Sequence, residues 1–426
     1  MTKRTKRGQR DGRMDRYIPN RSAMNMDVSA MHVCEHATPS MGKSTPYHQA
    51  LTLTMFGVPD LSAVPVYKLT KNAANRMEQG STPSSVRRVE TGVVKTVSAL
   101  RIMDAPMVEN DFYLNLLDWG EMDVLAIALG KSVHLWDHRK KSHSQLVSYR
   151  NNIVTSLKWG ISSNRHLLAV GIDNGTAQVW DTQTKQCITR IGGHIARVGS
   201  MAWRGPTLTT GSLDNTIAHH DPRMPNHQIT MLRHHTGEIC GLEWSPDERM
   251  LVSGGSDHVA CVWSKDFSRT TPLHVITAHT AAVKALRWSP WDVGILATGG
   301  GSSDKTIKRW RITERTCKLQ HSVDTMSQVS GLVWSQPELH HSKQLLSSHG
   351  PVSNTIKLWD VGGMALIKEY GGHARRILNM AASPDGSAVA TLSADETLHF
   401  WPGFDAKLAT KKRPRDDSSL LTGLLR

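Results

Sequence analysis

The chain has 426 residues, 39% of them hydrophobic, and its 51 Lys and Arg against 37 Asp and Glu give a formal net charge of +14. This length holds one large domain with flanking segments, or two or three ordinary domains. No run of about 18 consecutive apolar residues is present, which excludes a transmembrane helix. The basic first residues also lack the apolar stretch of a secretory signal.

The five cysteines are odd in number, widely separated and free of any CxxC pair. The sequence therefore predicts neither a disulfide framework nor a structural zinc site, and it favours a reducing, intracellular setting. The positive charge lies mainly in the flanks, because residues 99–403 carry 30 Lys and Arg against 27 Asp and Glu. This distribution argues against a surface that follows phosphates, so no nucleic-acid partner is expected.

Residues 1–96 are polar, contain scattered Ser, Thr and Pro, and lack a sustained strand pattern. Such a segment buries too little apolar surface to fold alone, so we expect it to be largely disordered when free. Its most distinctive motif is DRYIPNR (15–21), in which charged residues surround an apolar centre. Arginine can form a forked salt bridge while apolar side chains fill a groove, which predicts docking onto a partner. The candidate docking residues are Asp15, Arg16, Tyr17, Ile18, Pro19 and Arg21.

Three threonines of this first region precede a proline and are candidate phosphorylation sites: Thr38, Thr45 and Thr82. A phosphate adds about −1.5 to −2 charges. We therefore expect phosphorylation to weaken any docking that depends on the positive charge of this region.

Residues 97–404 repeat one strand pattern seven times. Strand-like segments that end in Trp or a substitute recur at positions 136, 180, 220, 263, 310, 359 and 401. A second series runs in phase with them, from LLDW (116–119) to NMAAS (379–383), and Gly, Asp, Asn and Ser mark the turns. Because a unit of short strands cannot bury both faces alone, it stacks on its neighbours in a ring. The sequence therefore predicts an all-β, seven-bladed WD-repeat β-propeller with a disordered N-terminal region and a short C-terminal tail.

Strand counting leaves the last repeat one strand short, and VSALRIM (97–103) precedes the first repeat. We expect this N-terminal strand to close the ring against the last repeat. The sequences DNG (173–175) and DNT (214–216) are expected to form tight hairpin turns, where Asn, Asp and Gly tolerate positive φ.

Most of the 22 histidines are expected to serve the structure rather than a metal site. Four of them stand at equivalent positions of their repeats, where a histidine hydrogen-bonds a turn aspartate of the same blade, such as Asp214, Asp257 or Asp395. These four are His194, His235, His279 and His373. Enzyme signatures such as GxSxG, HExxH, a P-loop or a strand-to-helix GxGxxG are missing, so no catalysis and no cofactor are predicted.

Residues 405–426 form a basic tail that ends in SSLLTGLLR (418–426). Its apolar run, the cationic side chain of Arg426 and the terminal carboxylate suit capture by a groove of a helical-repeat protein. Leu425 and Arg426 are the candidate docking residues.

The flanking motifs resemble those of the Fizzy-type co-activators of the anaphase-promoting complex, the ubiquitin ligase that drives chromosome separation. DRYIPNR matches the family's C-box, and the following SAM (22–24) resembles the Fizzy branch. The tail resembles the family's Ile-Arg ending, with Leu in place of Ile, whereas VPVYKLT (64–70) is a degenerate match to a checkpoint-binding segment. Further matches are LRIMDAPMVENDFYLNLLDW (100–119), HIARVGSMAW (194–203), WSPWDVGILATGGGSSD (288–304) and SADETLHFW (393–401).

The resemblance implies a subunit that recruits substrates to the anaphase-promoting complex and activates it during mitosis. Its implied partners are TPR-type subunits of the complex, degron-bearing substrates such as cyclins and securin-like proteins, and spindle-checkpoint proteins. No membrane partner is implied, and the expected location is the nucleus and cytoplasm.

The resemblance also implies a groove between the first and last blades that reads destruction boxes (Arg-x-x-Leu). Asp118 and Glu396 match the acidic positions that hold the degron arginine, and two carboxylates can accept a forked guanidinium. Leu116 and Leu117 are expected to help form its apolar pocket. A second site, for KEN-type degrons, is implied on the top face at Arg376 and Asn354.

An alternative function from another class is a general WD-repeat scaffold in a chromatin or RNA assembly. Deletion of the C-box discriminates the two, because a scaffold should associate normally without it. An enzyme is a third hypothesis, for which a screen for turnover would be the only support.

Overall fold

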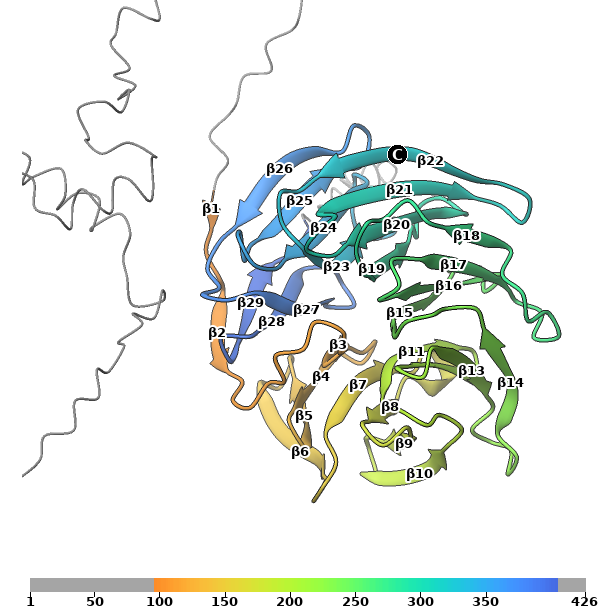
Figure 1. The fold of residues 1–426 in the computed structure, drawn as a ribbon. Helices are drawn as coiled ribbons and strands as arrows, with labels where there is room; N and C mark the ends of the chain where they lie inside the picture. The colour runs from red at the N-terminus through yellow and green to blue at the C-terminus, as the bar shows by residue number, and fades with distance from the viewer. Residues whose placement is uncertain (1–95, 405–426) are drawn as a thin grey trace, which may run out of the picture. The chain divides into compact units, whose positions relative to one another are not determined.

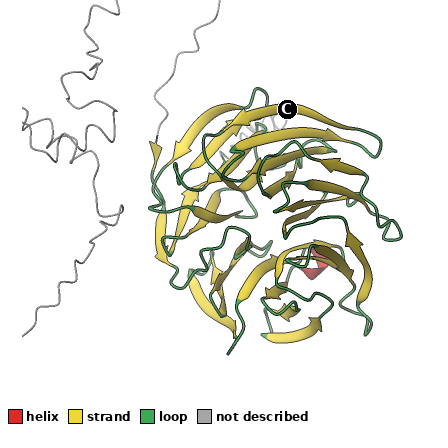
Figure 2. Cartoon of the chain, in the orientation of Figure 1, coloured by secondary structure: helices red, strands yellow, loops and turns green. Residues whose placement is uncertain are grey.

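Short strands joined by tight turns make up nearly all of residues 96–404, the part of the chain that the computed structural model describes. They form seven sheets arranged around a central axis (Figure 1). The described residues contain one short 3₁₀ turn, η4 (Ser162–Asn164), and no α-helix (Figure 2). The predicted seven-bladed β-propeller is confirmed.

Blades 1 to 5 each consist of four consecutive antiparallel strands. Blade 1 contains β3 (Leu117–Trp119), β4 (Val124–Leu129), β5 (Ser132–Asp137) and β6 (Ser142–Ser148). Blade 2 contains β7 (Val154–Trp159), β8 (Leu167–Ile172), β9 (Ala177–Asp181) and β10 (Gln186–Ile191). Blade 3 contains β11 (Val198–Arg204), β12 (Thr207–Ser212), β13 (Thr216–His220) and β14 (Gln228–Arg233). Blade 4 contains β15 (Ile239–Trp244), β16 (Met250–Gly255), β17 (Ala260–Ser264) and β18 (His274–Ile276). Blade 5 contains β19 (Val283–Trp288), β20 (Ile295–Gly300), β21 (Thr306–Ile312) and β22 (Cys317–Asp324).

Blades 6 and 7 each take a strand from the N-terminal side of the repeats. Blade 6 contains β23 (Val329–Trp334), β24 (Gln344–His349), β25 (Ile356–Asp360) and β26 (Ala365–Tyr370), and β1 (Thr96–Val97) joins it parallel to β26. Blade 7 contains β27 (Ile377–Ala382), β28 (Ala388–Ser393) and β29 (Thr397–Pro402), and β2 (Arg101–Asp104) is its fourth strand.

The ring closes through β2, which pairs antiparallel with β29 in a register that sets Arg101 opposite Phe400 and Asp104 opposite Thr397. This confirms that a strand from before the first repeat completes the last one. The parallel pairing of β1 with β26 was not predicted.

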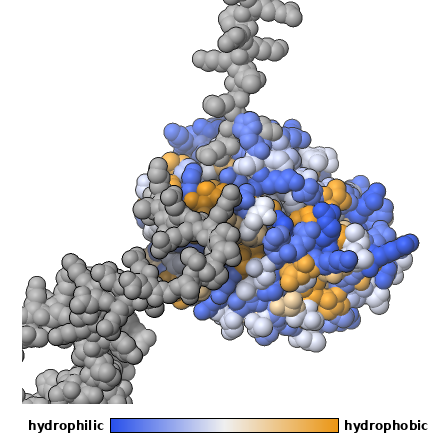
Figure 3. All heavy atoms as spheres, turned by 90° about the horizontal axis from the view of Figure 1, so that it is seen from above, coloured by the Kyte–Doolittle hydropathy of each residue, from blue (hydrophilic) through white to orange (hydrophobic). Residues whose placement is uncertain are grey.

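The innermost strand of each blade packs against those of its two neighbours around the ring. The largest hydrophobic cluster spans the closure, since it joins blade 1 residues such as Leu116 and Trp119 to blade 7 residues such as Leu398 and Phe400. The rings of Trp119 and Phe400 meet edge-on, with their centroids 5.8 Å apart. On the face seen in Figure 3, hydrophobic groups form separate patches among hydrophilic ones.

A buried polar network ties the turns of a blade to its third strand. In blade 7, His373 Nδ1 lies 3.1 Å from Asp395 Oδ2 and its Nε2 lies 2.8 Å from Thr391 Oγ1. Thr391 Oγ1 also accepts a hydrogen bond of 2.8 Å from Trp401 Nε1. The predicted pairing of histidine with a turn aspartate is confirmed in four blades, by His194–Asp214, His235–Asp257, His279–Asp304 and His373–Asp395.

Blade 3 carries His220 where the other six blades carry tryptophan, and its Nε2 lies 3.0 Å from Thr210 Oγ1. Burial, reinforced by the neighbouring His227, lowers the pKa of His220 to about 3. Burial likewise lowers the pKa of His373 to about 4. The neutral form of each ring is therefore the one that the fold requires.

We expect the free energy of unfolding to fall as the pH drops from about 6.5 towards 4. In this range the histidines of the unfolded chain bind protons, whereas the buried histidines of the folded protein stay neutral. Replacing His220 with tryptophan, the residue of the other six blades at this position, removes one such group. At pH 5 the variant should gain on the order of 1–2 kcal/mol relative to wild type, compared with the difference at pH 7.5. Thermal unfolding of both proteins at both pH values measures this, and a pH-independent difference would contradict the assignment.

Candidate functional site

Two exposed acidic residues lie at the point where the ring closes, and we call them the acidic edge: Asp104 and Glu396. Glu396 occupies the β28–β29 turn with φ of 62°, and its carbonyl oxygen accepts a hydrogen bond of 2.8 Å from Ala105 N. Asp104 ends β2 opposite Thr397, the residue after Glu396. Within residues 96–404, neither carboxylate has a hydrogen-bond or ion-pair partner. The backbone therefore holds two unpartnered acids at neighbouring positions of one exposed edge.

The acidic edge borders the seam between blades 7 and 1. Met103 packs against the hydrophobic cluster that these blades share, and the Arg101 guanidinium lies 4.6 Å from the centre of the Trp136 ring in blade 1. Ile102 and Met107 are 60% and 69% exposed beside it. Negative charge and accessible apolar side chains thus occur together here.

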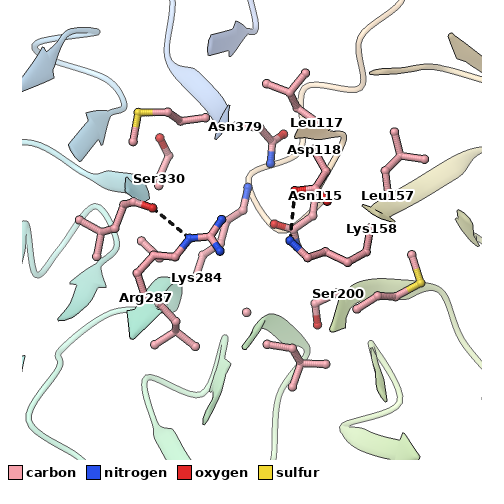
Figure 4. A pocket seen from close by; sticks show the side chains of 18 residues that line it. Asn115, Leu117, Asp118, Leu157, Lys158, Ser200, Lys284, Arg287, Ser330 and Asn379 are labelled. Carbon is pink, nitrogen blue, oxygen red and sulfur yellow. Dashed lines mark hydrogen bonds and ion pairs between the residues drawn. The ribbon is translucent and has the colours of Figure 1, made fainter. Parts of the chain in front are cut away.

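Asp118 occupies a different place, on the inner strand β3 in the wall of the central channel (Figure 4). Its Oδ1 accepts a hydrogen bond of 3.1 Å from Lys158 Nζ, and its Oδ2 accepts one of 2.8 Å from Trp159 N. The Asp118 side chain is 14% exposed. Its carboxylate is therefore bonded to blade 2.

The same arrangement recurs between blades 4 and 5. Glu243 also precedes the tryptophan that ends its inner strand, and it accepts hydrogen bonds of 2.9 Å from Arg287 Nη1 and from Trp288 N. A carboxylate thus binds the cation and the tryptophan amide of the next blade in both places. This repetition indicates that Asp118 links adjacent blades.

The structure does not bring Asp118 and Glu396 together. Asp118 lies beside the β3–β4 turn, and Gly120 of that turn lines the same hollow as Pro384 of the β27–β28 turn. Glu396 lies in the next turn of blade 7, at the other end of the six-residue strand β28. Strands rise about 3.3 Å per residue, so the two residues lie near opposite ends of blades roughly 20 Å long.

The other two residues predicted for the destruction-box groove lie in the core. Leu116 and Leu117 are 1% and 6% exposed and belong to the cluster between blades 1 and 7. The residue that sequence reasoning missed is Asp104, which stands in the motif LRIMDAP (100–106). The signal that finds it is the register of the closing strand, because pairing with β29 sets Asp104 beside Glu396.

The two residues predicted for a KEN-type site are both partly buried and have different surroundings. Arg376 Nε donates a hydrogen bond of 2.8 Å to the side-chain oxygen Oδ1 of Asn110, and Arg376 Nη2 donates one of 2.6 Å to the backbone carbonyl of Asn110. Asn354 lies in the β24–β25 turn with φ of 51°, and its buried Oδ1 has no hydrogen-bond partner within residues 96–404. No interaction joins the two side chains in this part of the chain.

The segment between β2 and β3 is fastened to several blades. Arg197 of blade 3 donates to Asp111 Oδ2 at 2.7 Å and also binds both carboxylate oxygens of Glu238. Lys284 of blade 5 donates from Nζ to the carbonyls of Leu114 and Leu378, at 2.8 Å each. Burial lowers the pKa of Lys284 to about 7. These contacts fix the path of the chain from the acidic edge to the channel.

Among residues 96–404, no group of three or more His, Cys, Asp or Glu side chains is arranged to hold a metal ion. Likewise, no helix in the described range has the length and apolar character needed to cross a membrane. The C-box residues Asp15 to Arg21, the threonines Thr38, Thr45 and Thr82, and the tail residues Leu425 and Arg426 lie outside the described residues.

The sequence and the fold were compared with those of known proteins, and the matches identify a family. Residues 103–401 match the family model described as the CDC20/Fizzy WD40 domain. "Cell division cycle 20.1, cofactor of APC complex" of Arabidopsis thaliana is 40% identical over 94% of this chain and 89% of that protein. "Anaphase-promoting complex subunit cdc20" of Dictyostelium discoideum is 41% identical over 75% of this chain and 63% of that protein. A chain of the structure described as "Crystal Structure of Mitotic Checkpoint Complex" is similar with a TM-score of 0.69 and 38% identity, over 77% of this chain and 98% of that one.

The geometry predicts effects on stability of different size for the two kinds of acidic residue. Asp118→Ala should cost about 1–3 kcal/mol, because it strips a buried amide and a half-buried lysine of their acceptor. Asp104→Ala and Glu396→Ala should change stability by less than about 0.5 kcal/mol, since neither carboxylate has a partner to lose. Urea unfolding of the three variants tests this, and equal effects would refute the distinction.

Proposed function

The chain belongs to the CDC20/Fizzy WD40 family, and from this premise we propose that it recruits substrates to the anaphase-promoting complex and activates that ubiquitin ligase. As a member of this family it is a non-catalytic WD40 adaptor. The proposal is supported by relatives named as a cofactor or a subunit of that complex, with about 40% identity to this chain. Its C-box, DRYIPNR (15–21), supports the docking role.

The acidic edge is the observation that carries substrate binding in this proposal. A destruction box presents an arginine and, three residues later, a leucine. The guanidinium is a planar fork that can bind carboxylates in two directions at once. Asp104 and Glu396 offer two carboxylates that no other group within residues 96–404 uses, so binding an arginine would break no ion pair.

The leucine of the motif needs an apolar surface near these carboxylates. Ile102 and Met107 expose such surface beside the acidic edge, whereas Leu116 and Leu117 lie buried in the core. We therefore assign the arginine site to Asp104 and Glu396 and place the leucine on the seam between blades 7 and 1. In this assignment Asp104 takes the role that the family resemblance gave to Asp118.

Docking on the ligase is proposed to use the C-box and the tail residues Leu425 and Arg426, with TPR-type subunits as their receptors. Cyclins and securin-like proteins are the proposed substrates. Spindle-checkpoint proteins are proposed as further partners, which is supported by the similarity to a chain of a mitotic checkpoint complex. The proposed site of action is the nucleus and cytoplasm.

Removing both charges of the acidic edge should weaken destruction-box binding at least tenfold, because a charge-assisted hydrogen bond is worth about 1.5–3 kcal/mol. The measurement is fluorescence anisotropy of an Arg-x-x-Leu peptide with the full chain and its Asp104→Asn, Glu396→Gln double variant. An Arg-to-Ala peptide controls for the motif. A second variant, Glu314→Gln with Glu338→Gln, removes two exposed acids outside the acidic edge and controls for net charge. Asp118→Asn is a third variant, and a loss confined to it would move the arginine site into the channel. Equal binding by wild type and double variant would refute the acidic edge as the receptor.

Deleting residues 15–21 should abolish co-purification with large subunits of the ligase while leaving peptide binding by the propeller intact. The reason is that docking and substrate binding use separate parts of the chain in this proposal. Affinity purification of the tagged full chain and of the deletion variant gives the answer. A scaffold of a chromatin or RNA assembly would keep its partners after the deletion, so unchanged co-purification would favour that alternative.

A further inference from the structure

A basic hollow of about 250 Å³ lies between blades 5 and 6. Its cationic side chains are Arg309 and Arg311 of β21 and Lys343, which precedes β24. We propose that this hollow binds a phosphoryl group carried on a serine or threonine side chain of a partner peptide. The hollow takes no part in the proposed binding of the degron arginine.

Arg309 supplies the first reason, because its hydrogen bonding is incomplete. One terminal nitrogen, Nη1, donates to the carbonyl of Val361 in blade 6. Nε is buried and has no partner among the described residues. A buried N–H without an acceptor is costly, and more so on a charged group. The other terminal nitrogen, Nη2, also has no hydrogen bond within residues 96–404 and is not enclosed, so it can donate to an oxygen of a bound anion.

The charges around the hollow supply the second reason. Lys343 pairs with Asp292 at 2.7 Å, and these side chains are 45% and 41% exposed. An exposed ion pair of this kind contributes little to stability, so the ammonium of Lys343 is also available to bind an anion. With Asp292 counted against the three cations, the lining carries a net charge of +2. A phosphate monoester carries about −1.5 to −2 charges at neutral pH, which matches the lining.

Asp360 is the other carboxylate whose charge acts on Arg309, and it accepts a hydrogen bond of 3.3 Å from Gly363 N. It lies outside the lining of the hollow. Burial lowers the pKa of Arg309, and Arg311 lowers it further, whereas the carboxylates of Asp292 and Asp360 raise it.

The apolar residues of the hollow favour a peptide over free phosphate. Ile295, Trp334 and Val361 form part of its lining beside the cations. They provide contact for the carbon atoms of a side chain, which inorganic phosphate lacks. A nucleic-acid backbone is disfavoured, because residues 99–403 carry 30 basic against 27 acidic side chains and so offer no extended basic track.

The test is fluorescence anisotropy of labelled Ala-Ala-pThr-Ala-Ala and its phosphoserine counterpart with the full chain. Inorganic phosphate serves as competitor, and the unphosphorylated peptide serves as control. The variant Arg309→Gln, Arg311→Gln removes two cations of the hollow. The single variant Arg311→Gln is compared with Arg315→Gln, which removes one exposed arginine of the β21–β22 turn outside the hollow and is its matched control.

Wild type and Arg315→Gln should bind the phosphopeptides alike, and the double variant at least tenfold more weakly. If loss of Arg309 prevents folding, the variant Arg311→Gln, Lys343→Gln gives the same readout, since both of its side chains are exposed. Three results would overturn the proposal: no phosphopeptide binding by wild type, binding of inorganic phosphate alone, or equal weakening by Arg315→Gln.

Discussion

The pairing of β2 with β29 is the constraint on which the rest of the molecule depends. Without it, blade 7 would end in an unpaired edge and the cluster between blades 7 and 1 would open to water. Because β2 precedes the first repeat and β29 ends the last, this pairing joins the two ends of the ring non-covalently. It also sets the path of the segment that follows, which Arg197 and Lys284 then fasten to blades 3 and 5.

The same pairing explains which parts of the site could be predicted from the sequence. The seven repeats were predictable, because strand endings recur every 40 to 49 residues whatever the three-dimensional register. The histidine–aspartate pairs were predictable because both partners lie within one repeat. Asp104 was not, because its position beside Glu396 depends on the register of two strands nearly 300 residues apart. The hydrogen bonds of Asp118 to blade 2 were not predictable either, because the position of a residue on a strand does not show which blade its carboxylate contacts.

The central channel shows how the fold uses charge for structure. Asp118 and Glu243 each bind a cation and a tryptophan amide of the following blade, so each links two neighbouring inner strands by hydrogen bonds. Lys284 reaches two carbonyls that belong to blade 7 and to the segment before blade 1. A buried ammonium is costly, yet here it joins parts of the chain that no strand pairing connects. Polar residues of the channel are therefore poor candidates for ligand contacts, because their hydrogen bonds are already made.

This contrast gives a criterion for the surface of the propeller. The groups assigned to ligands are those whose hydrogen-bonding capacity the fold leaves largely unused within residues 96–404: the carboxylates of Asp104 and Glu396, and the guanidinium of Arg309. They lie on different blades and near opposite ends of the strands, since Glu396 follows β28 whereas Lys343 precedes β24. One ligand therefore cannot displace the other directly. Any coupling between them would pass through the packed inner strands, and close-packed interiors resist gradual deformation. The ring thus presents these two surfaces as independent sites on one rigid frame, and in the proposed function the flanking segments connect that frame to the ligase.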